Sequence, residues 1–350
     1  MVILYLYAEI MGYQIPVFEE YVEKYQADVH VVHWNHKKLT PYVPPQINGV
    51  SFYNRTDFNL NNFMEFCSEI CPDIIYVSGW MDKLYLKVVR RLKKNGIPIV
   101  VGFDDIWFNT FKQIIGKLIF PIMKRLYFSH AWVAGPYQYE YAKKLGFRNS
   151  EIIFNCLTAD VKLFNKCFQD NLINKSKKYP KRFLYVGRFN KTKGLDILIN
   201  AWAEISNEQK EWDLTIIGNG PMDFSSQDMS KITVIDFLQP EKLVEIAKDF
   251  GCLIIPSRNE PWGVVIHEFV ALGLPIISSD ICGANPIFVI HGYNGFIFKS
   301  SDIQDLKEKI LMMSKMEKEA LINFSKNSHS LGSRITPEIS AGSFMSILNR

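Results

Sequence analysis

The feature that most constrains the fold of this chain is a repeated alternation of short apolar runs with helix-length segments. The first series contains VILYLYA (2–8), DVHVVHW (28–34), GVSFY (49–53), DIIYVS (73–78), IPIVVGF (97–103), HAWVAG (130–135) and EIIF (151–154). Continuous apolar strands separated by helices are typical of a parallel sheet that is covered on both faces. The first run predicts a strand instead of a signal peptide, because no basic leader precedes it and Glu9 interrupts it.

The same alternation starts again further along the chain. The second series contains RFLYVG (182–187), DLTIIG (213–218), ITVI (232–235), CLIIPS (252–257), PIISS (275–279) and GFIF (295–298). Between the two series, NKCFQDNLINKSKKYPKR is polar, rich in lysine and without periodicity, which favours a linker. A chain of 350 residues suits two domains. We therefore expect two doubly wound Rossmann-like α/β domains facing a cleft, over residues 1–165 and 166–330, with a terminal helix in 331–350 that packs back on the first domain.

Composition excludes several classes of protein. With 48% hydrophobic and 22% charged residues, the chain is globular, and no apolar stretch reaches the ~18 residues that span a bilayer, so we expect a cytoplasmic protein. His30, His33 and His36 alternate along a strand and do not supply a closed set of metal ligands. Six cysteines without C-x-x-C spacing indicate buried thiols instead of a metal site or disulfides: Cys67, Cys71, Cys156, Cys167, Cys252 and Cys282.

Basic residues gather in one part of the first domain. Residues 83–139 contain ten Lys and Arg against Asp104 and Asp105, a local balance of +8. No nucleic-acid recognition module accompanies them. One interpretation is a peripheral contact with the anionic inner face of a membrane; the other is that the apolar residues cover the sheet while the lysines face water. The membrane interpretation assigns the contact to Lys112, Lys117, Lys124 and Arg125, with insertion of Phe111, Ile115 and Phe120.

The strongest local signal is NEPWGVVIHEFVALGLPIISS, in which Glu260 and Glu268 bracket a helical pattern that begins near Gly263. The N–H groups of Val264 and Val265 then lack helical acceptors, and the helix dipole adds positive charge there, which suits a diphosphate. Eight positions at the helical rise span about 12 Å, roughly the separation between the ribose and the hexose of a sugar nucleotide. One glutamate can then contact each end. Alternatively, the pair comprises an ordinary acid at a helix N-terminus and a solvated helix residue.

Two further loops lie at the carboxyl edge of the second predicted sheet, where open α/β sheets bind their ligands. VGRFNKTKGLDIL places Arg188 and Lys193 in one loop, where both can stabilise negative charge on a departing nucleotide; the alternative is an ordinary basic loop. IIGNGP fails the G-x-G-x-x-G spacing because Asp223 replaces the last glycine, which disfavours hydride transfer. Gly218 and Gly220 either let the backbone approach a base or ribose, or form a tight turn.

Taken together, these segments resemble glycosyltransferase family 4. GRFNKTKG, IIGNGP, PSRNEPWGVVIHEFVALGLPIISSD and GYNGFIF follow the family's order and approximate spacing, and FNCLTADVKLF resembles the start of its interdomain linker. The resemblance implies a GT-B fold and retaining transfer of a sugar from a nucleotide-diphosphate sugar, without a metal or another cofactor. It further implies a glycan or lipid-linked acceptor and a role in surface polysaccharide biosynthesis.

The resemblance also assigns roles to individual residues. Arg188 and Lys193 would hold the donor diphosphate, Glu260 would contact the donor sugar and Glu268 the ribose. Attack would come from the face on which the phosphate departs, so no nucleophilic side chain is needed. The remaining residues predicted to contact the substrate are Gly12, Gly218, Gly220, Pro261, Trp262, Gly263, Val264 and Val265.

Three departures from the family pattern affect these roles. GFDDIW places Asp104 where the family often has a histidine, which predicts an acceptor-side polar group. AEIMGYQIP contains only Gly12 of a frequent glycine pair, and CGANPIFVI lacks a glutamate that many members have near the donor. Two other functions remain open, a sugar-nucleotide 2-epimerase and a non-catalytic sugar-nucleotide-binding subunit. Intact Glu260, Arg188 and Lys193 favour transfer over both.

Overall fold

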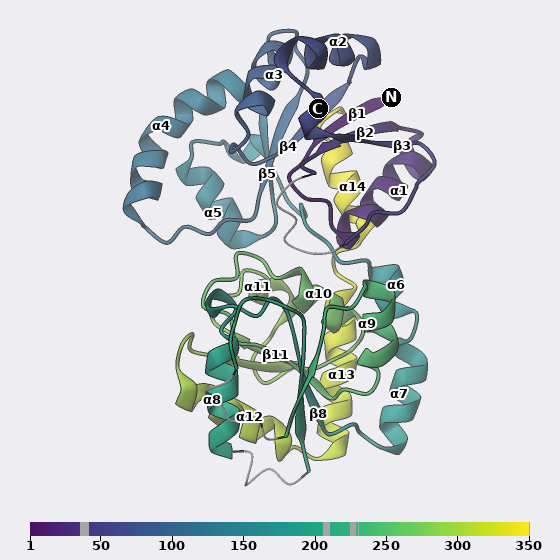
Figure 1. Cartoon of the computed structure of the whole chain (residues 1–350), viewed down its shortest axis with the longest axis vertical. Coiled ribbons are helices and arrows are strands. Elements are labelled where there is room, and N and C mark those ends of the chain that lie inside the picture. The colour runs from purple at the N-terminus through teal and green to yellow at the C-terminus, as the bar shows by residue number, and fades with distance from the viewer. Residues whose placement is uncertain (36–41, 206–210, 225–228, 230, 350) are drawn as a thin grey trace. The chain divides into compact units, whose positions relative to one another are not determined.

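The computed structural model of the chain divides into two compact units (Figure 1). Unit 1 contains Met1–Asp160 and Ile335–Arg350, and unit 2 contains Val161–Arg334. The first crossing between the units thus lies a few residues before the boundary expected at residue 165. The structure describes residues 1–35, 42–205, 211–224, 229 and 231–349.

Unit 1 is built on a seven-stranded parallel sheet with the strand order β3-β2-β1-β4-β5-β6-β7. Its strands are β1 (Val2–Leu6), β2 (Asp28–His33), β3 (Val50–Asn54), β4 (Ile74–Ser78), β5 (Ile99–Phe103), β6 (His130–Val133) and β7 (Ile152–Ile153). Successive side chains point to opposite faces, so Leu4 and Leu6 join one apolar core while Ile3 and Tyr5 join another. The predicted sheet with two covered faces is confirmed.

Helices cover both faces of this sheet. They are α1 (Ile15–Tyr25), α2 (Leu60–Ile70), α3 (Lys83–Lys93), α4 (Phe111–Tyr127), α5 (Pro136–Lys144) and α14 (Pro337–Met345). Asn59, Asp82 and Thr110 cap the starts of α2, α3 and α4 by accepting hydrogen bonds from backbone N–H groups. Figure 1 shows α14 beside α1, and Phe344 of α14 packs against the ring of Tyr21. The last helix is therefore part of unit 1.

Unit 2 repeats the architecture with six parallel strands in the order β10-β9-β8-β11-β12-β13. The strands are β8 (Arg182–Val186), β9 (Asp213–Ile217), β10 (Ile232–Ile235), β11 (Cys252–Ile255), β12 (Ile276–Ser279) and β13 (Gly295–Phe298). The helices are α6 (Val161–Asn165), α7 (Phe168–Lys177), α8 (Leu195–Ile205), α9 (Pro240–Ala247), α10 (Val264–Ala271), α11 (Asn285–Phe288), α12 (Ile303–Ser314) and α13 (Lys318–Gly332). The chain order reverses between β8 and β11, which makes their carboxyl ends the switch point of this sheet.

The lysine-rich segment predicted to be a linker is instead mostly helical. It forms α7, whose inner side packs against α13 within unit 2. The buried residues of α7 are Phe168, Asn171 and Lys175, which share one helical face, and the ring of Phe168 stacks on that of His329 with 3.5 Å between centroids. Two of these three inward positions carry polar residues, so the apolar pattern alone did not reveal the helix.

All six cysteines are free thiols in the structure. Four are buried as expected, whereas Cys71 is exposed and Cys167 is half-buried, so the expectation of burial was wrong for these two. In the part of the chain that the structure describes, no helix is both long enough and apolar enough to cross a membrane.

Candidate functional site

The candidate site lies at the carboxyl ends of β8 and β11 in unit 2. The loop after β8 and the loop after β11 are joined by backbone hydrogen bonds, since the N–H groups of Arg258 and Asn259 donate to the carbonyl of Thr192 at 2.9 and 3.2 Å. The guanidinium of Arg258 adds a second connection by donating two hydrogen bonds to Asp196, at 2.6 and 2.8 Å. Hydrogen bonds from this guanidinium lower the pKa of Asp196 although burial opposes them. These contacts hold the two loops together.

A buried ion pair occupies the centre of this loop assembly. The ammonium of Lys193 donates to Glu260 Oε2 at 2.6 Å, and the hydroxyl of Ser257 donates to the same oxygen at 3.1 Å. Glu260 is only 6% exposed, so its carboxylate depends on these partners to offset the cost of burial. Asn190 positions the lysine, because its side chain accepts the backbone N–H of Lys193 at 2.9 Å and caps a short 3-10 turn.

The loop that carries Glu260 is also fixed from its other side. The N–H groups of Gly283 and Ala284, in the loop after β12, donate to the carbonyls of Glu260 and Trp262 at 3.0 Å each. Helix α10 begins at Val264, directly after Gly263, which has a φ of +94°. Glu260 therefore lies before the helix, and the separation of about 12 Å expected from helical rise does not apply to this pair.

Two glycines let the neighbouring loops approach closely. Gly194 has a φ of +67°, and a Cβ at that position would lie 1.9 Å from the carbonyl oxygen of Pro256. Gly218, which follows β9, has a φ of +145°, and its Cβ would lie 1.9 Å from the carbonyl oxygen of Gly187. Gly220 is similarly close to the backbone of Phe189. Side chains at these positions would separate the loops that form the site.

Arg188 offers a cation that the protein itself does not engage. Its side chain is half-buried, and among the described residues no hydrogen bond or ion pair involves its guanidinium, although its carbonyl accepts the hydroxyl of Tyr185 at 2.9 Å. The first-turn N–H groups of α10, at Val264 and Val265, lack carbonyl acceptors within the helix. The half-buried Lys193 differs from Arg188, because its charge is shared with Glu260.

Two ionisable groups near Glu260 stay protonated at neutral pH. Burial, followed by the negative charge of Glu260, raises the pKa of the Cys282 thiol to about 12. The same two causes raise the pKa of the Tyr185 hydroxyl well above its usual range. A thiol with such a pKa is a poor nucleophile, so Cys282 is not suited to covalent catalysis.

The remaining predicted residues fall into two groups. Glu268 lies half-buried on α10, after Pro261 and the buried Trp262 in the chain. Gly12 and Asp104 belong to unit 1: Gly12 begins a 3-10 turn, and the carbonyl of Asp104, just after β5, accepts the side-chain amide of Gln138 at 2.8 Å. The contacts within unit 2 thus bring the loops that carry Arg188, Lys193 and Glu260 together with the glycine loops, whereas Gly12 and Asp104 are part of unit 1.

Several residues of the site were missed from the sequence. Ser257 shares Glu260 Oε2 with Lys193, and its carbonyl accepts the hydroxyl of Ser279 at 2.7 Å. Arg258 and Asn190 position the loops. The only sequence signal for Asn190 was its place at the start of N-K-T-K, which is a helix-capping pattern. The partner of Arg258 is 62 residues away, and no local pattern indicates such a pair.

No described residues form a group of histidines, cysteines and carboxylates that could hold a metal ion. His30 stacks on Tyr53 and packs against Phe66, so its ring contributes to the packing of unit 1. His36, the third histidine of this segment, lies outside the described residues.

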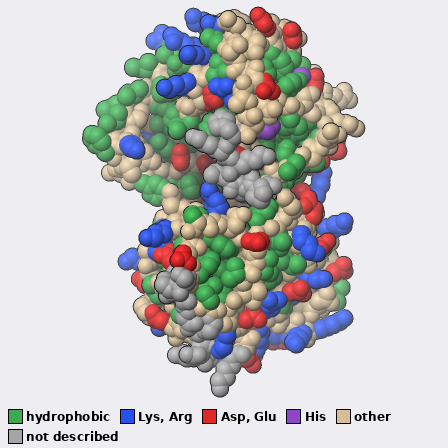
Figure 2. Space-filling view, viewed as in Figure 1, with side chains coloured by type: hydrophobic (Ala, Val, Ile, Leu, Met, Phe, Trp, Pro, Cys, Tyr) green, Lys and Arg blue, Asp and Glu red, His purple; other side chains and the backbone are tan. Residues whose placement is uncertain are grey.

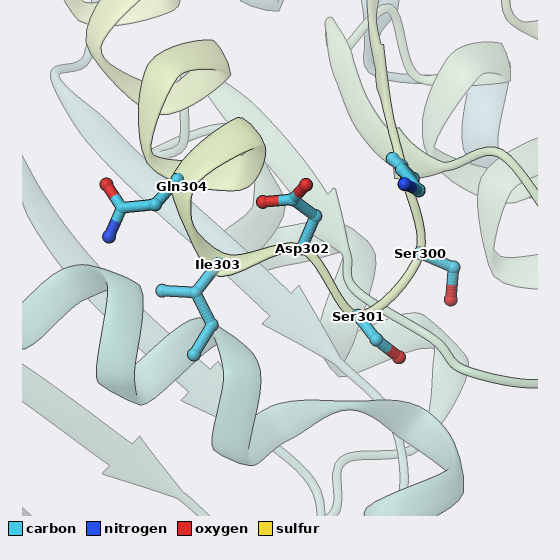
Figure 3. A pocket seen from close by; sticks show the side chains of 6 residues that line it. Ser300, Ser301, Asp302, Ile303 and Gln304 are labelled. Atoms are coloured by element: carbon cyan, nitrogen blue, oxygen red, sulfur yellow. The ribbon is translucent and has the colours of Figure 1, made fainter.

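A shallow depression of about 340 Å³ lies at the end of β13, lined by residues 299–304. Figure 3 shows its polar side chains on the turn that leads into α12. Asp302 caps that helix, and the hydroxyl of Ser300 donates to the carbonyl of Ser257 at 3.4 Å. The polar side chains that line the depression are therefore explained by the cap of α12 and the contact with the loop after β11.

Comparison with known proteins identifies the domain that carries these loops. Residues 168–330 match the family model described as "Glycosyl transferases group 1". This part of the chain is therefore similar to the proteins of that family. An uncharacterized glycosyltransferase of Methanocaldococcus jannaschii is 34% identical over 134 residues, which are 37% of this chain and 36% of that protein. The chain therefore aligns with about a third of this curated relative.

Solved structures match the chain over nearly its whole length. Sucrose-phosphate synthase from Thermosynechococcus elongatus superposes with a TM-score of 0.76 and 16% identity, covering 99% of this chain and 98% of that one. Anabaena HepE in complex with UDP gives a TM-score of 0.74 and 15% identity, with complete coverage of both chains. At these identities the match shows the fold alone, and the predicted GT-B fold class is confirmed.

Proposed function

We propose that this protein is a glycosyltransferase that moves a sugar from a nucleotide-diphosphate sugar to a hydroxyl of a glycan or lipid-linked acceptor, with retention of anomeric configuration. The observation that carries the proposal is the pairing of a buried Glu260 with Lys193, on a loop that also carries Arg188, whose guanidinium has no partner among the described residues. These groups lie at the switch point of a parallel sheet, where such sheets bind ligands.

The geometry suits a donor whose diphosphate carries the negative charge. Arg188 supplies a free bidentate donor, and the first turn of α10 supplies backbone N–H groups and the positive end of the helix dipole. Lys193 supplies a second positive charge without losing contact with Glu260. Together these groups stabilise charge on the departing diphosphate, which is the term that most accelerates such a transfer. No metal ion is required in this scheme.

The proposed step transfers one glycosyl group. The bond between the anomeric carbon and the diphosphate oxygen breaks, and the acceptor oxygen bonds to the anomeric carbon on the same face. The acceptor proton passes to the departing phosphate, so the products are the glycosylated acceptor and the nucleoside diphosphate. Glu260 is buried and ionically paired, and we assign it to the donor sugar, where a negative charge stabilises the positive character of the transition state.

The solved structures of similar fold suggest which donor to test first. HepE of Anabaena has been solved with UDP-glucose, so UDP-glucose is the first donor to test. A role in surface polysaccharide biosynthesis fits an acceptor that is a glycan or is linked to a lipid. Incubation with a panel of nucleotide sugars, first for protection against thermal unfolding and then for release of the nucleoside diphosphate, tests the proposal. An epimerised nucleotide sugar without transfer, or binding without turnover on any acceptor, would contradict it.

The two glutamates, Glu268 on α10 and Glu260 in the loop before it, test the proposed roles separately.

 Glu268→Gln should weaken binding of both the free nucleoside diphosphate and the donor roughly 10- to 150-fold, because a charged hydrogen bond to a ribose hydroxyl is worth roughly 1.5 to 3 kcal/mol. Glu260→Gln should leave binding of the free nucleotide almost unchanged and lower the single-turnover rate. Calorimetric affinity and single-turnover kinetics measure the two effects, with circular dichroism to confirm folding.

The matched control is Glu241→Gln, an exposed acid in the first turn of α9. It should match the unmodified protein in both measurements. Equal loss of nucleotide affinity in both glutamate variants, with turnover preserved in Glu260→Gln, would return the pair to ordinary structural roles.

A further inference from the structure

Helix α4 of unit 1 turns an apolar face outward. Phe111, Leu118 and Ile122 are 76%, 74% and 65% exposed, and they recur at spacings of seven and four residues. Further exposed apolar side chains on the same helical face are Ile114, Ile115, Ile119 and Leu126. Figure 2 shows hydrophobic side chains gathered over this part of the molecule. A continuous exposed patch of this kind usually marks an interaction surface.

The opposite side of α4 is committed to the fold. Phe120 is the buried residue of the helix and stacks on Phe128, so the earlier assignment of Phe120 to a membrane contact was wrong. Lys124 was also assigned to that contact, but its ammonium pairs with Glu151 and donates to the carbonyl of Gly146 at 3.0 Å. The outward apolar face is therefore not used to pack α4 against the rest of unit 1.

Basic residues flank this apolar face. Lys112, Lys117 and Arg125 are exposed on α4, and the helix contains no acidic residue. The neighbouring helix α3 adds exposed Arg90 and Arg91. The positive charge around the apolar face indicates which kind of partner can cover it. A second copy of the chain would bring two basic surfaces together, whereas an anionic surface complements the basic residues while its interior accepts the apolar side chains.

We propose that α4 is an interfacial helix that lies in the surface of an anionic phospholipid bilayer. Phe111, Leu118 and Ile122 enter the boundary between headgroups and acyl chains, while Lys112, Lys117 and Arg125 contact the anionic headgroups. Helix α4 then lies in the membrane surface and does not cross it. This binding needs no donor or acceptor, so it is independent of the proposed sugar transfer.

Co-sedimentation of the full chain with vesicles tests the proposal. One set of vesicles contains phosphatidylcholine alone, and the other contains phosphatidylcholine with phosphatidylglycerol, both at moderate salt. Preferential binding to the anionic vesicles, weakened by added salt, is expected. Equal binding to both vesicles, or binding to neither, would overturn the proposal.

Two sets of variants separate the apolar and the charged contributions. The triple variant F111S/L118S/I122S should reduce partitioning to anionic vesicles at least tenfold, because it removes the inserted side chains. K112Q/K117Q/R125Q should reduce it about 100-fold at low salt and less at high salt, since each basic residue adds about 1 kcal/mol. The matched controls are Ile173→Ser and Lys248→Gln, exposed residues of unit 2 that should bind like the unmodified protein.

A tryptophan at the face reports insertion directly. In Leu118→Trp, the emission of the new tryptophan should shift to shorter wavelength with anionic vesicles and be quenched by brominated acyl chains, relative to the unmodified protein. Light scattering without vesicles examines the competing occupant. A concentration-dependent dimer that F111S/L118S/I122S abolishes, together with no shift on vesicles, would show that a second copy covers this face and would overturn the membrane proposal.

Discussion

Both sheets have an arginine just after the carboxyl end of a strand, but the two side chains have different surroundings. In unit 1, Arg55 follows β3 and is fully engaged, since it donates to both oxygens of Asp82 at 2.8 and 3.1 Å. Trp34 donates to the same carboxylate at 3.0 Å. In unit 2, Arg188 follows β8 and its guanidinium has no partner among the described residues. The arginine of unit 1 thus stabilises a loop, whereas that of unit 2 is available to an anionic ligand.

Helices α10 of unit 2 and α4 of unit 1 also differ in how much of their surface is buried. Helix α10 of unit 2 is buried along much of its length, including Ile266, Phe269 and Val270, so its first turn and the half-buried Glu268 are left for a ligand. Helix α4 of unit 1 buries Phe120 and exposes its apolar face. Unit 2 therefore has tightly packed loops around the proposed diphosphate site, while unit 1 has a broad exposed apolar surface on α4. The comparison predicts loss of rate from changes to the available charge of unit 2 and loss of stability from changes to the packed loops around it. Changes in unit 1 should affect stability or surface binding.

The largest expected effect is that of Arg188→Ala. Removal of one charge-stabilising donor from the departing diphosphate should lower kcat roughly 100- to 1000-fold, or about 3 to 4 kcal/mol, with little change in melting temperature because no side-chain contact is lost. Steady-state kinetics and thermal unfolding measure both quantities. Lys191→Ala, an exposed lysine on the same loop, should leave kcat close to that of the unmodified protein. An unchanged kcat in Arg188→Ala with only a raised KM would contradict the assigned role.

A smaller effect is expected from an alanine at Gly194. This glycine has a φ of +67°, and an added Cβ would lie 1.9 Å from the carbonyl oxygen of Pro256. Gly79, after β4 in unit 1, has a φ of +72° but nothing within 4 Å of the added atom. Backbone strain alone predicts a loss of about 1 kcal/mol in the free energy of unfolding for Gly79→Ala, and the clash raises the loss to about 3 kcal/mol for Gly194→Ala.

Urea unfolding measures both alanine variants, and the comparison is internal because the two backbone conformations are similar. Equal losses would show that the loops of unit 2 yield to the added methyl group, and the tight packing of the loops around the proposed diphosphate site would then be wrong.

The sequence predicted the sheets better than the site. Every apolar run of both series became a strand, because parallel strands buried on both faces are continuous apolar segments. The helix α7 was missed, since Asn171 and Lys175 occupy its inward positions. A charged residue can be buried when its charge has a partner, as for Lys175, whose ammonium lies 5.6 Å from the centroid of the Tyr179 ring. Apolar periodicity cannot detect such positions.

For the site, the motif residues were predicted and their pairing was not. Lys193 and Glu260 were chosen for separate contacts with the donor, yet they bind each other. The pairing depends on the adjacency of β8 and β11, which are separated in the chain by β9 and β10. No local pattern in the sequence encodes that adjacency. The sequence also could not decide which way the apolar face of α4 points, because an apolar helix has the same sequence pattern whether it covers a sheet or faces outward.

The smallest expected effect concerns an ionic contact that belongs to the structure of unit 1. Glu151 accepts hydrogen bonds from the backbone N–H of Arg148 and from Lys124, which lies on α4. Burial acts to raise the pKa of this carboxyl, but the hydrogen bonds from Arg148 and Lys124 prevail and lower it from 4.5 to about 2. A folded-state pKa below the unfolded one means that the carboxylate stabilises the protein above pH 4.5 and that this contribution disappears as the pH falls towards 2.

Glu151→Gln should therefore lower the free energy of unfolding by about 1 kcal/mol at pH 7, as expected for a partly exposed ion pair. The difference from the unmodified protein should shrink as the pH falls below 4.5, which urea unfolding between pH 7 and pH 3 can follow. Glu140→Gln, an exposed acid on α5, should show neither effect. A difference that stays constant over this pH range would mean that Glu151 acts through packing, and the contrast between structural charges in unit 1 and available charges in unit 2 would lose one of its supports.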